Sequence, residues 1–405
     1  MTTNGLTIED NSPVEIVTHQ EEHDGASLNT PLIVASPVVR RSENHTFGQS
    51  LLRYITSKIP IADLPQRPSR VIVRPYRSGE ELYLSLNTKT DKLFNRQRPY
   101  LRYVEPTDTL EVLCIPGNDS IKHYASLVAT YYGLVTFGNK VLTQYSLPRR
   151  LECDSWLRAS NLRELSGVRT VVLGYVERLN RAGASPQCWN SGIEVDDPTR
   201  KLFAWQIHRP TDSDRGFGRG PIAFLGCLFN FWGDIAASLV QVLHQLCHVH
   251  EIIYIGKAGS LREDDEPNNV ISTGNTSWLN DAQVTWNDAL QRALSDYCPP
   301  EVQTGENTSV FSPIEETHEW LSTWRKRSRW VDCEVGYLAQ ACNNNCISFG
   351  YLNIISDNVA RWYEHDLSNE RLEIVQEKRK GLLSVIESVL DRHLGLPPVV
   401  KRMET

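Results

Sequence analysis

The sequence lacks three features that would assign it to a familiar functional class. No apolar run approaches the roughly 18–20 residues needed to span a bilayer. Basic residues are not in excess: the 405 residues carry a formal net charge of −7, which argues against attraction to nucleic acid or an anionic membrane. Metal-ligand sets are also missing, because neither Cys247-His248-Val249-His250 nor the pair Cys342/Cys346 is half of a known set. With 40% hydrophobic and 22% charged residues, we expect a soluble globular protein of one large or two smaller domains.

The N-terminus and the cysteines indicate the cellular compartment of the protein. The segment from Met1 to Asn11 is polar and acidic, unlike a secretory signal or an arginine-rich transit peptide. The nine cysteines are odd in number and have apolar neighbours, which indicates reduced, buried thiols rather than a disulfide framework. We therefore expect a cytoplasmic protein.

Composition and pattern divide the chain into four parts. Residues 1–45 are rich in Glu, Asn, Ser, Thr and Pro, and we expect them to be disordered. Residues 46–108 combine a helical pattern with strand-like runs, which predicts a small α/β extension. Residues 109–395 are expected to form the main domain, with an insertion at about 140–220, and residues 396–405 a tail.

Strands and helices alternate along the main domain. The apolar run Leu110–Ile115, a turn at Gly117 and a helical pattern from Ile121 to Tyr132 predict a strand–turn–helix unit. A second unit of this kind is expected at 251–261, and the stripe Leu372–Leu390 predicts a long last helix. This order predicts an α/β fold with a mixed central sheet flanked by helices.

The apolar run from Cys346 to Ile355 carries the most functional information. It predicts a buried strand with Asp357 at its tip, and open α/β folds bind ligands beyond the carboxyl ends of such strands. An ordinary turn or helix-cap aspartate is the plainer interpretation of Asp357. Arg371 follows at the start of the last helix, where a surface salt bridge is the plainer interpretation.

A second acidic group precedes that strand. Asp332 and Glu334 alternate around Cys333, so one carboxylate is expected to face a pocket while the other faces solvent. Either one, taken alone, is more typical of a solvated charge.

Three glycines are typical of turns that accommodate phosphate, namely Gly117, Gly256 and Gly259. Tight strand-to-helix turns need glycine for other reasons, so both interpretations stay open. The glycine-containing run Arg215–Gly220 precedes a strand instead of linking a strand to a helix, and we reject it as a dinucleotide loop.

Taken in order, these segments resemble the nucleoside phosphorylase superfamily, which comprises purine nucleoside and uridine phosphorylases and their hydrolase relatives. The likeness covers about residues 110–394 in pieces and is strongest from Val310 to Leu390. Five features follow the family's order there: Phe311-Ser312-Pro313, Val331-Asp332-Cys333-Glu334, Ile355-Ser356-Asp357, Glu370-Arg371 and the C-terminal helix. Upstream, Pro116-Gly117-Asn118 is similar to the first phosphate loop, and residues 255–261 are similar to the central glycine motif.

This resemblance implies a role for each matching residue. Asp357 is expected to be the general acid that protonates or hydrogen-bonds the leaving base, an effect typically worth about 10²–10⁴-fold. Arg371 would position that aspartate. Glu334 would hold the ribose 2′- and 3′-hydroxyls, and Cys333 would replace the family's usual methionine under the sugar. The other expected substrate contacts are Asp332, Phe311 and Ser356.

The phosphate-binding half of the motif set departs from the family. Tyr254 stands where many phosphorylases have an arginine, and Lys257 stands where they have a hydroxyl residue. A phosphate site would then consist of Gly117, Gly256, Lys257 and Gly259, with lysine as a point charge rather than an arginine fork. Phosphorolysis, which is favoured by its frequency in the family, and hydrolysis both stay open, as does a noncatalytic nucleoside-binding domain.

The expectation is therefore an enzyme that cleaves the N-glycosidic bond of a purine or related nucleoside. It would be a glycosyltransferase of the nucleoside phosphorylase type or an N-glycosidic hydrolase. No cofactor is expected other than phosphate as co-substrate in the first case. The resemblance also implies a homo-oligomer.

Overall fold

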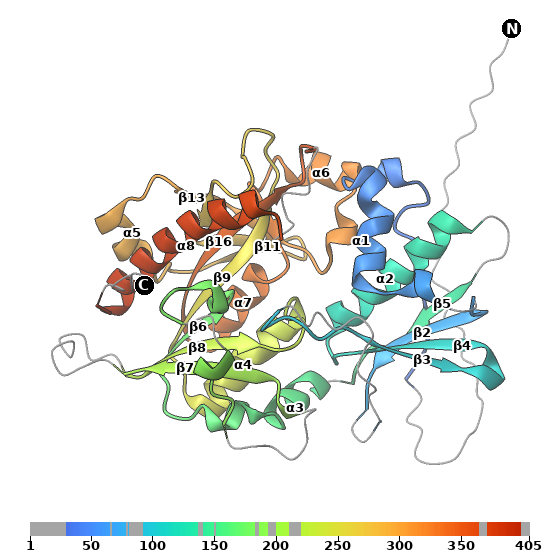
Figure 1. Cartoon of the computed structure of the whole chain (residues 1–405), viewed down its shortest axis with the longest axis horizontal. Helices are drawn as coiled ribbons and strands as arrows, with labels where there is room; N and C mark the ends of the chain where they lie inside the picture. The colour runs from blue at the N-terminus through green and yellow to red at the C-terminus, as the bar shows by residue number, and fades with distance from the viewer. Residues whose placement is uncertain are drawn as a thin grey trace, which may run out of the picture.

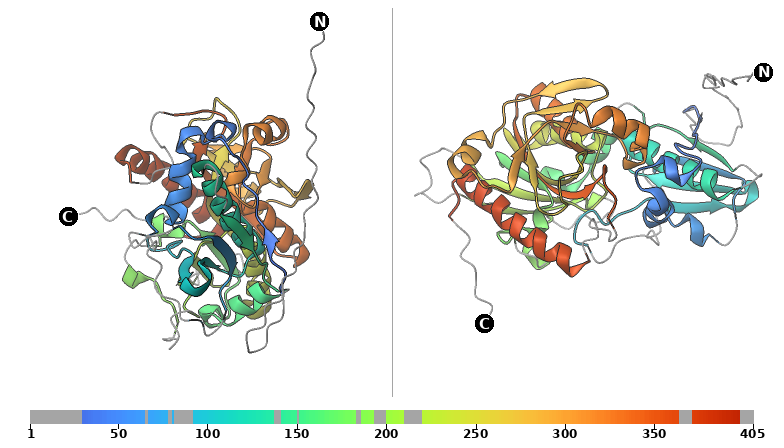
Figure 2. Two further views of the ribbon diagram at one scale, coloured as in Figure 1. Left: turned by 90° about the vertical axis from the view of Figure 1, so that its right-hand side faces the viewer. Right: turned by 90° about the horizontal axis from the view of Figure 1, so that it is seen from above.

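The computed structural model describes residues 30–64, 67–77, 80, 92–136, 141–149, 151–182, 186–192, 200–209, 220–363 and 371–397. Two sheets, each with its own helices, lie side by side (Figure 1 and Figure 2). The small body comes from the first part of the chain and the large body from the rest.

The small body is a five-stranded sheet with two helices. Its strands lie in the order β1 (Ile33–Val34), β5 (Leu142–Tyr145), β2 (Arg70–Pro75), β4 (Thr109–Cys114) and β3 (Tyr100–Val104). The three inner strands are parallel, and the two edge strands are antiparallel. Alternating apolar residues of β2 and β4 pack in one core with the helices α1 (Leu51–Lys58) and α2 (Asn118–Val135).

The large sheet branches at β9 (Glu251–Ser260). On one side β9 pairs in parallel with β16 (Ser348–Asn358). On the other side its first half pairs in parallel with β6 (Thr170–Gly174), and its last two residues pair antiparallel with β15 (Trp330–Asp332). The remaining strands are β8 (Ile222–Cys227) and β7 (Phe203–His208) beyond β6, β10 (Ile271–Thr273) and β13 (Val302–Thr304) beyond β16, and β14 (Asn307–Ser309), β11 (Thr276–Leu279) and β12 (Ala282–Thr285) beyond β15.

Helices cover both faces of the large sheet. One apolar core joins it to α3 (Glu152–Arg158), α4 (Asp234–Cys247) and α7 (Val335–Asn344), and a second joins its other face to α5 (Gln291–Tyr297) and α8 (Glu373–Leu394). The helix α6 (His318–Trp324) packs Leu321 against Val331 of β15. The predicted fold class, α/β with a mixed central sheet flanked by helices, is confirmed.

The expected division of the chain requires correction. β4 pairs in parallel with β2, so residues 109–145 belong to the small body although the main domain was expected to start at 109. The stretch 140–220 is not a single insertion, because β6 lies beside β9 in the centre of the large sheet. Within 1–45, the described residues 30–45 include β1 and a buried His45. Strand pairing depends on which apolar faces meet, and local composition does not report this.

Neither disulfides nor membrane spans are found in the described part of the chain. All nine cysteines are free thiols; five are buried, whereas Cys188, Cys298 and Cys346 are exposed. Among the described residues, no helix combines the length and apolarity required to cross a bilayer.

The two bodies meet at residues 312–317, around the short helix η10 (Pro313–Glu315). His45 Nε2 lies 2.9 Å from the carbonyl oxygen of Ile314, and Ile314 is buried in the core of the small body. His123 Nδ1 of α2 lies 2.6 Å from Ser312 Oγ. The small body therefore lies against the same segment that leads from β14 to α6.

Candidate active site

The end of β16 positions Asp357. The strand runs through Asn358, and a register shift between Ile355 and Asp357 places Asp357 opposite Gly259 of β9. Ser356 Oγ donates a hydrogen bond of 2.7 Å to Asp357 Oδ1. Gly259 allows this approach, because a Cβ there would lie 3.1 Å from Asp357 Oδ2. Asp357 is half-buried, and its role as general acid stays a prediction.

Glu334 lies at the start of α7, beside β9. Its carboxylate accepts hydrogen bonds from the backbone N–H of Cys333, at 3.2 Å, and from the hydroxyl of buried Tyr254. Burial and the nearby Asp332 raise the pKa of Glu334 well above its usual value, against the opposing influence of Lys257. The Tyr254 hydroxyl is thus a neutral hydrogen-bond donor to the Glu334 carboxylate.

Asp332 differs from the expectation of a substrate contact. Its carboxylate accepts hydrogen bonds from Ser309 Oγ at 2.6 Å, Asn307 Nδ2 at 2.9 Å, Val335 N–H at 3.1 Å and Asn353 Nδ2 at 3.3 Å. Burial nevertheless raises its pKa. With four protein donors, Asp332 fixes α7 against β14 and β16 and thereby positions Glu334. The alternating spacing around Cys333 could not reveal that the inward-facing carboxylate is already satisfied.

Cys333 lies at the centre of a group of carboxylates. Burial first, and then Glu334, Asp332, Glu316 and Asp119, raise the pKa of its thiol well above the usual value. We call these four residues, together with Asp357, the carboxylate cluster. Within the described residues no three His, Cys, Asp or Glu side chains are arranged to hold a metal ion.

Three residues of this site were not expected from the sequence, namely Asp119, Glu316 and Tyr54. Glu316 follows η10 and is buried, and its pKa is raised well above the usual value by burial and by Asp357. Tyr54 of α1 is held at the site by a stacked ring contact with Phe47, and its hydroxyl interacts electrostatically with Cys333, Glu316, Tyr124 and Asp357. The small body therefore contributes a hydroxyl to the site, and no local pattern around residue 54 signals this.

The expected first phosphate loop at Gly117 is occupied by protein. Gly117 precedes α2, and a Cβ there would lie 2.4 Å from Ile235 Cγ1, so the glycine allows α2 to approach α4. The backbone N–H groups of Asn118 and Asp119 donate to the carboxylate of Asp234, at 2.8 and 3.1 Å. In return, the backbone N–H of Asp234 donates to Asp119 Oδ2 at 3.0 Å. The two helix N-termini cap each other with carboxylates, where an anion would otherwise bind.

The expected central phosphate turn is a strand. Gly256, Lys257 and Gly259 all lie within β9, which continues to Ser260 instead of turning into a helix. A Cβ at Gly256 would lie 2.5 Å from the ring of Tyr254 and 2.6 Å from Asn353 Oδ1, so this glycine serves close packing. Lys257 Nζ lies 5.0 Å from the centre of the Tyr175 ring. Glycine in a crowded strand and glycine in a turn look alike in one sequence.

Phe311 and Arg371 are the remaining predicted residues. Phe311 is half-buried and follows β14 by two positions, next to Ser312 at the junction with the small body. Arg371 is exposed and precedes α8, which begins at Glu373 rather than at Arg371; the other residue of the motif, Glu370, lies outside the described residues. The positioning of Asp357 by Arg371 stays a prediction. The structure thus brings together Asp357, Ser356, Cys333, Glu334 and Asp332, with Gly259 alongside.

No protein-family model matches this sequence, and no curated protein matches it. The chain is similar to solved structures of nucleoside-cleaving enzymes at low identity. Purine nucleoside phosphorylase from Toxoplasma gondii is 12% identical with a TM-score of 0.42, over 57% of this chain and 91% of that chain. The 5′-methylthioadenosine/S-adenosylhomocysteine nucleosidase from Campylobacter jejuni is 9% identical with a TM-score of 0.41, over 56% of this chain and 100% of that chain. The corresponding nucleosidase from Neisseria meningitidis is 13% identical with a TM-score of 0.39, over 56% and 98%. Likeness at this level assigns no activity, so a functional argument has to rest on the site.

Proposed function

We propose that this protein cleaves the N-glycosidic bond of a purine or related nucleoside, with water as the attacking nucleophile. The observation that carries this proposal is the carboxylate cluster, in which Glu334 lies beside Cys333, and Asp357 lies opposite Gly259 and interacts with Glu316. The type of substrate follows the sequence resemblance of residues 310–390, in which these same residues match the superfamily motifs.

Breaking this bond produces a cationic sugar and an anionic base. Carboxylates around the sugar stabilise the positive charge, and Asp357 donates a proton to the departing base nitrogen. The C1′–N bond breaks, a bond from C1′ to the water oxygen forms, and the proton lost by water restores Asp357. Glu334 accepts hydrogen bonds from the ribose hydroxyls and holds the ring over Cys333.

Water is favoured over phosphate by the charge of the site. Phosphate would have to approach a cluster of acids, while the N-termini of α2 and α4 are capped by Asp234 and Asp119. Tyr254 further supports this choice, since a neutral hydroxyl stands where an arginine fork would bind phosphate.

The test follows base release from inosine, adenosine, guanosine and uridine and from their 5′-monophosphates, with and without inorganic phosphate. We expect release of base and free sugar at a rate that phosphate does not increase. Formation of a sugar 1-phosphate only when phosphate is present would replace hydrolysis by phosphorolysis. Failure to release base from any of these compounds would overturn the proposal in favour of a noncatalytic binding domain.

A further inference from the structure

Arg98 lies in the connector of residues 92–99, which leads into β3 of the small sheet. Backbone N–H groups hold this connector on the end of β8: Asn95 donates to the carbonyl of Cys227, and Gln97 donates to that of Leu228. Arg98 itself is only 6% exposed. A guanidinium group is therefore brought deep into the junction of the two bodies.

Only neutral groups contact this guanidinium. Its Nη1 donates to the carbonyl oxygens of Asn95 and Gln97, at 3.0 and 3.1 Å, to Asn95 Oδ1 at 3.4 Å, and to Asn230 Oδ1 at 2.6 Å. Nε is buried without a hydrogen-bond partner. Within the part of the chain that the structure describes, no carboxylate forms a salt bridge with Arg98, although ion pairs such as Arg74–Glu80 and Arg329–Asp265 are present there.

This arrangement is costly for a stable fold. Removing a charge from water costs several kcal/mol unless an opposite charge compensates it. Burial accordingly lowers the pKa of Arg98, although the guanidinium stays charged. The guanidinium uses only Nη1 for its hydrogen bonds to Asn230 and the connector. Its other N–H donors are unused in the structure.

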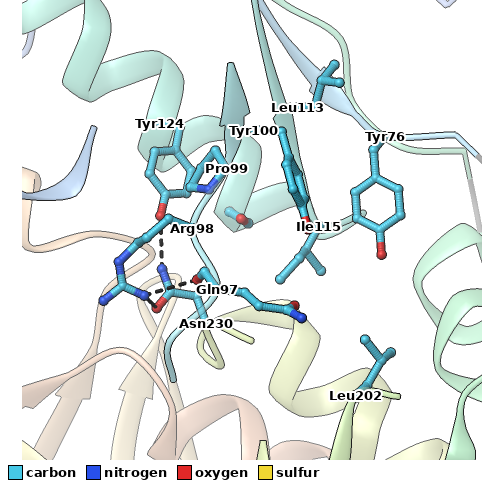
Figure 3. A pocket seen from close by; sticks show the side chains of 11 residues that line it. Tyr76, Gln97, Arg98, Pro99, Tyr100, Leu113, Ile115, Tyr124, Leu202 and Asn230 are labelled. Atoms are coloured by element: carbon cyan, nitrogen blue, oxygen red, sulfur yellow. Dashed lines mark hydrogen bonds between the residues drawn. The ribbon is translucent and has the colours of Figure 1, made fainter. Parts of the chain in front are cut away.

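Arg98 is one of the residues that line a pocket between the small and large bodies. Figure 3 shows Arg98 beside Tyr124 and Asn230, on the side of the pocket away from Tyr76. Asn230 Nδ2 donates to the hydroxyl of Tyr124 at 2.9 Å, which fixes the amide so that its oxygen faces Arg98. Tyr54 links the two places, because its hydroxyl interacts electrostatically with Arg98 and also with Asp357 of the carboxylate cluster.

We propose that Arg98 binds an oxyanion carried by the substrate, a phosphoryl group on the sugar, so that the enzyme prefers a nucleotide to a nucleoside. Arginine suits this role because its unused N–H groups can form paired, charge-assisted bonds with phosphoryl oxygens. The carboxylate cluster itself supplies no cation to hold an anion at the reacting carbon, whereas Arg98 receives one at a separate point. This inference rests on the proposed function, which supplies the sugar and the base.

The first experiment compares kcat/KM for a nucleoside and for its 5′-monophosphate. We expect the wild-type protein to prefer the monophosphate by about 10- to 100-fold, the range for hydrogen bonds to a charged group. Arg98→Gln should bring this ratio close to one, and Arg98→Lys should retain part of it. Arg292→Gln, at an exposed position of α5, removes the same charge and should leave the ratio unchanged. A wild-type ratio near one, with base released from both compounds, overturns the Arg98 proposal and leaves the proposed function standing.

A second experiment separates binding from turnover. In the Asp357→Asn background, calorimetry measures the Kd of the 5′-monophosphate and of inorganic phosphate, and we expect Arg98→Gln to weaken monophosphate binding about tenfold or more. If monophosphate binding depends on Arg98 but the wild type releases no base, the oxyanion site stands and the proposed function fails. If inorganic phosphate stimulates base release and Arg98→Gln abolishes this stimulation, Arg98 holds a free co-substrate, which overturns a substrate-borne group. Circular dichroism and the Tm show whether Arg98→Gln folds. If it does not fold, the kcat/KM ratio of the wild type and that of Arg98→Lys decide whether Arg98 binds the phosphoryl group.

Discussion

The candidate site has an acidic side, the carboxylate cluster, and a basic side at the junction with the small body. Burial shifts the pKa values of the two sides in opposite directions. On one side, burial raises the pKa of Glu316 and Glu334 of the carboxylate cluster. On the other, burial lowers the pKa of three bases at the junction with the small body, namely His45, His123 and Arg98. Desolvation penalises the charged form of each group, so both sides are driven toward neutrality.

The two sides also do not neutralise each other. In the described part of the chain, no salt bridge joins Glu316 or Glu334 to these bases. Acids and bases whose charged forms are disfavoured by burial are thus held near one another. Such a site suits a ligand that develops positive charge at one end and carries negative charge at the other, in agreement with the two proposals above.

The largest effect is expected at the acidic side, from Asp357→Asn. An amide cannot deliver a proton to the departing base, so we expect turnover to fall by about 10²–10⁴-fold with little change in substrate Kd. Steady-state kinetics and equilibrium binding separate the two quantities. Asp281→Asn provides the control, because Asp281 is exposed in a turn with φ of 62°, a conformation that asparagine accepts. Equal turnover in wild type and Asp357→Asn would refute the general-acid role.

Glu334→Ala should damage both binding and turnover. The variant removes the acceptor for the sugar hydroxyls, and we expect kcat/KM to fall by about 10- to 100-fold with contributions from kcat and KM. Glu319→Ala, at an exposed position of α6, is the matched control and should behave like wild type. A normal KM for Glu334→Ala would remove Glu334 from the sugar site.

Tyr254→Phe tests the neutral hydrogen-bond donor to Glu334. The Tyr254 hydroxyl favours the ionised form of Glu334, so its loss should raise the pKa of that carboxyl further. We expect the acidic limb of the kcat/KM profile to move to higher pH, with a loss of about 2- to 10-fold near neutrality. Tyr297→Phe on α5 should leave the profile in place. An unshifted limb in Tyr254→Phe would show that Glu334 does not control the profile.

The smallest effects concern stability, and they have opposite signs on the two sides. The pKa of His45 falls from 6.5 to about 4, so the unfolded chain binds a proton that the folded state excludes between these values. His45 therefore makes the free energy of unfolding fall as the pH falls from 6.5 toward 4. The raised pKa of Glu316 acts oppositely: the folded state binds the extra proton, and stability falls as the pH rises above about 4.5.

Urea unfolding across the range from pH 4 to 6.5 measures both slopes. His45→Gln should lose the acid-side decline, since protonation of Nδ1 would oppose the N–H of Phe47, which His45 now accepts at 3.0 Å. Glu316→Gln should lose the alkaline-side decline. Unchanged slopes in both variants would show that other groups set the pH dependence.

Segments with strong local patterns were predicted well. The apolar run before Asp357 is indeed the buried strand β16, and the amphipathic stripe of the last helix corresponds to α8, which ends at Gly395 with φ of 66°. The βα unit at Gly117 is also present as β4 and α2. Periodic burial and a glycine cap are encoded by neighbouring residues, so a single sequence reports them.

Residues from distant parts of the chain that meet only in the folded protein could not be predicted from the sequence. Tyr54 and Glu316 meet because the small body packs on residues 312–317, whereas Arg98 is placed by hydrogen bonds of its connector to the end of β8. The same limit applies at Gly256 and Gly259, where a glycine in a crowded strand looks like a glycine in a turn.

By itself, the sequence determined that the protein is α/β, that a buried strand carries Asp357 at its end, and that acids flank Cys333, because these features depend on neighbours along the chain. Only the tertiary structure decided that Asp332 is already satisfied, that carboxylates cap the two helix N-termini, and that Arg98 is buried without a counter-charge between the small and large bodies. The physical reason is desolvation and pairing: whether a polar group is free for a ligand depends on which distant segment folds against it.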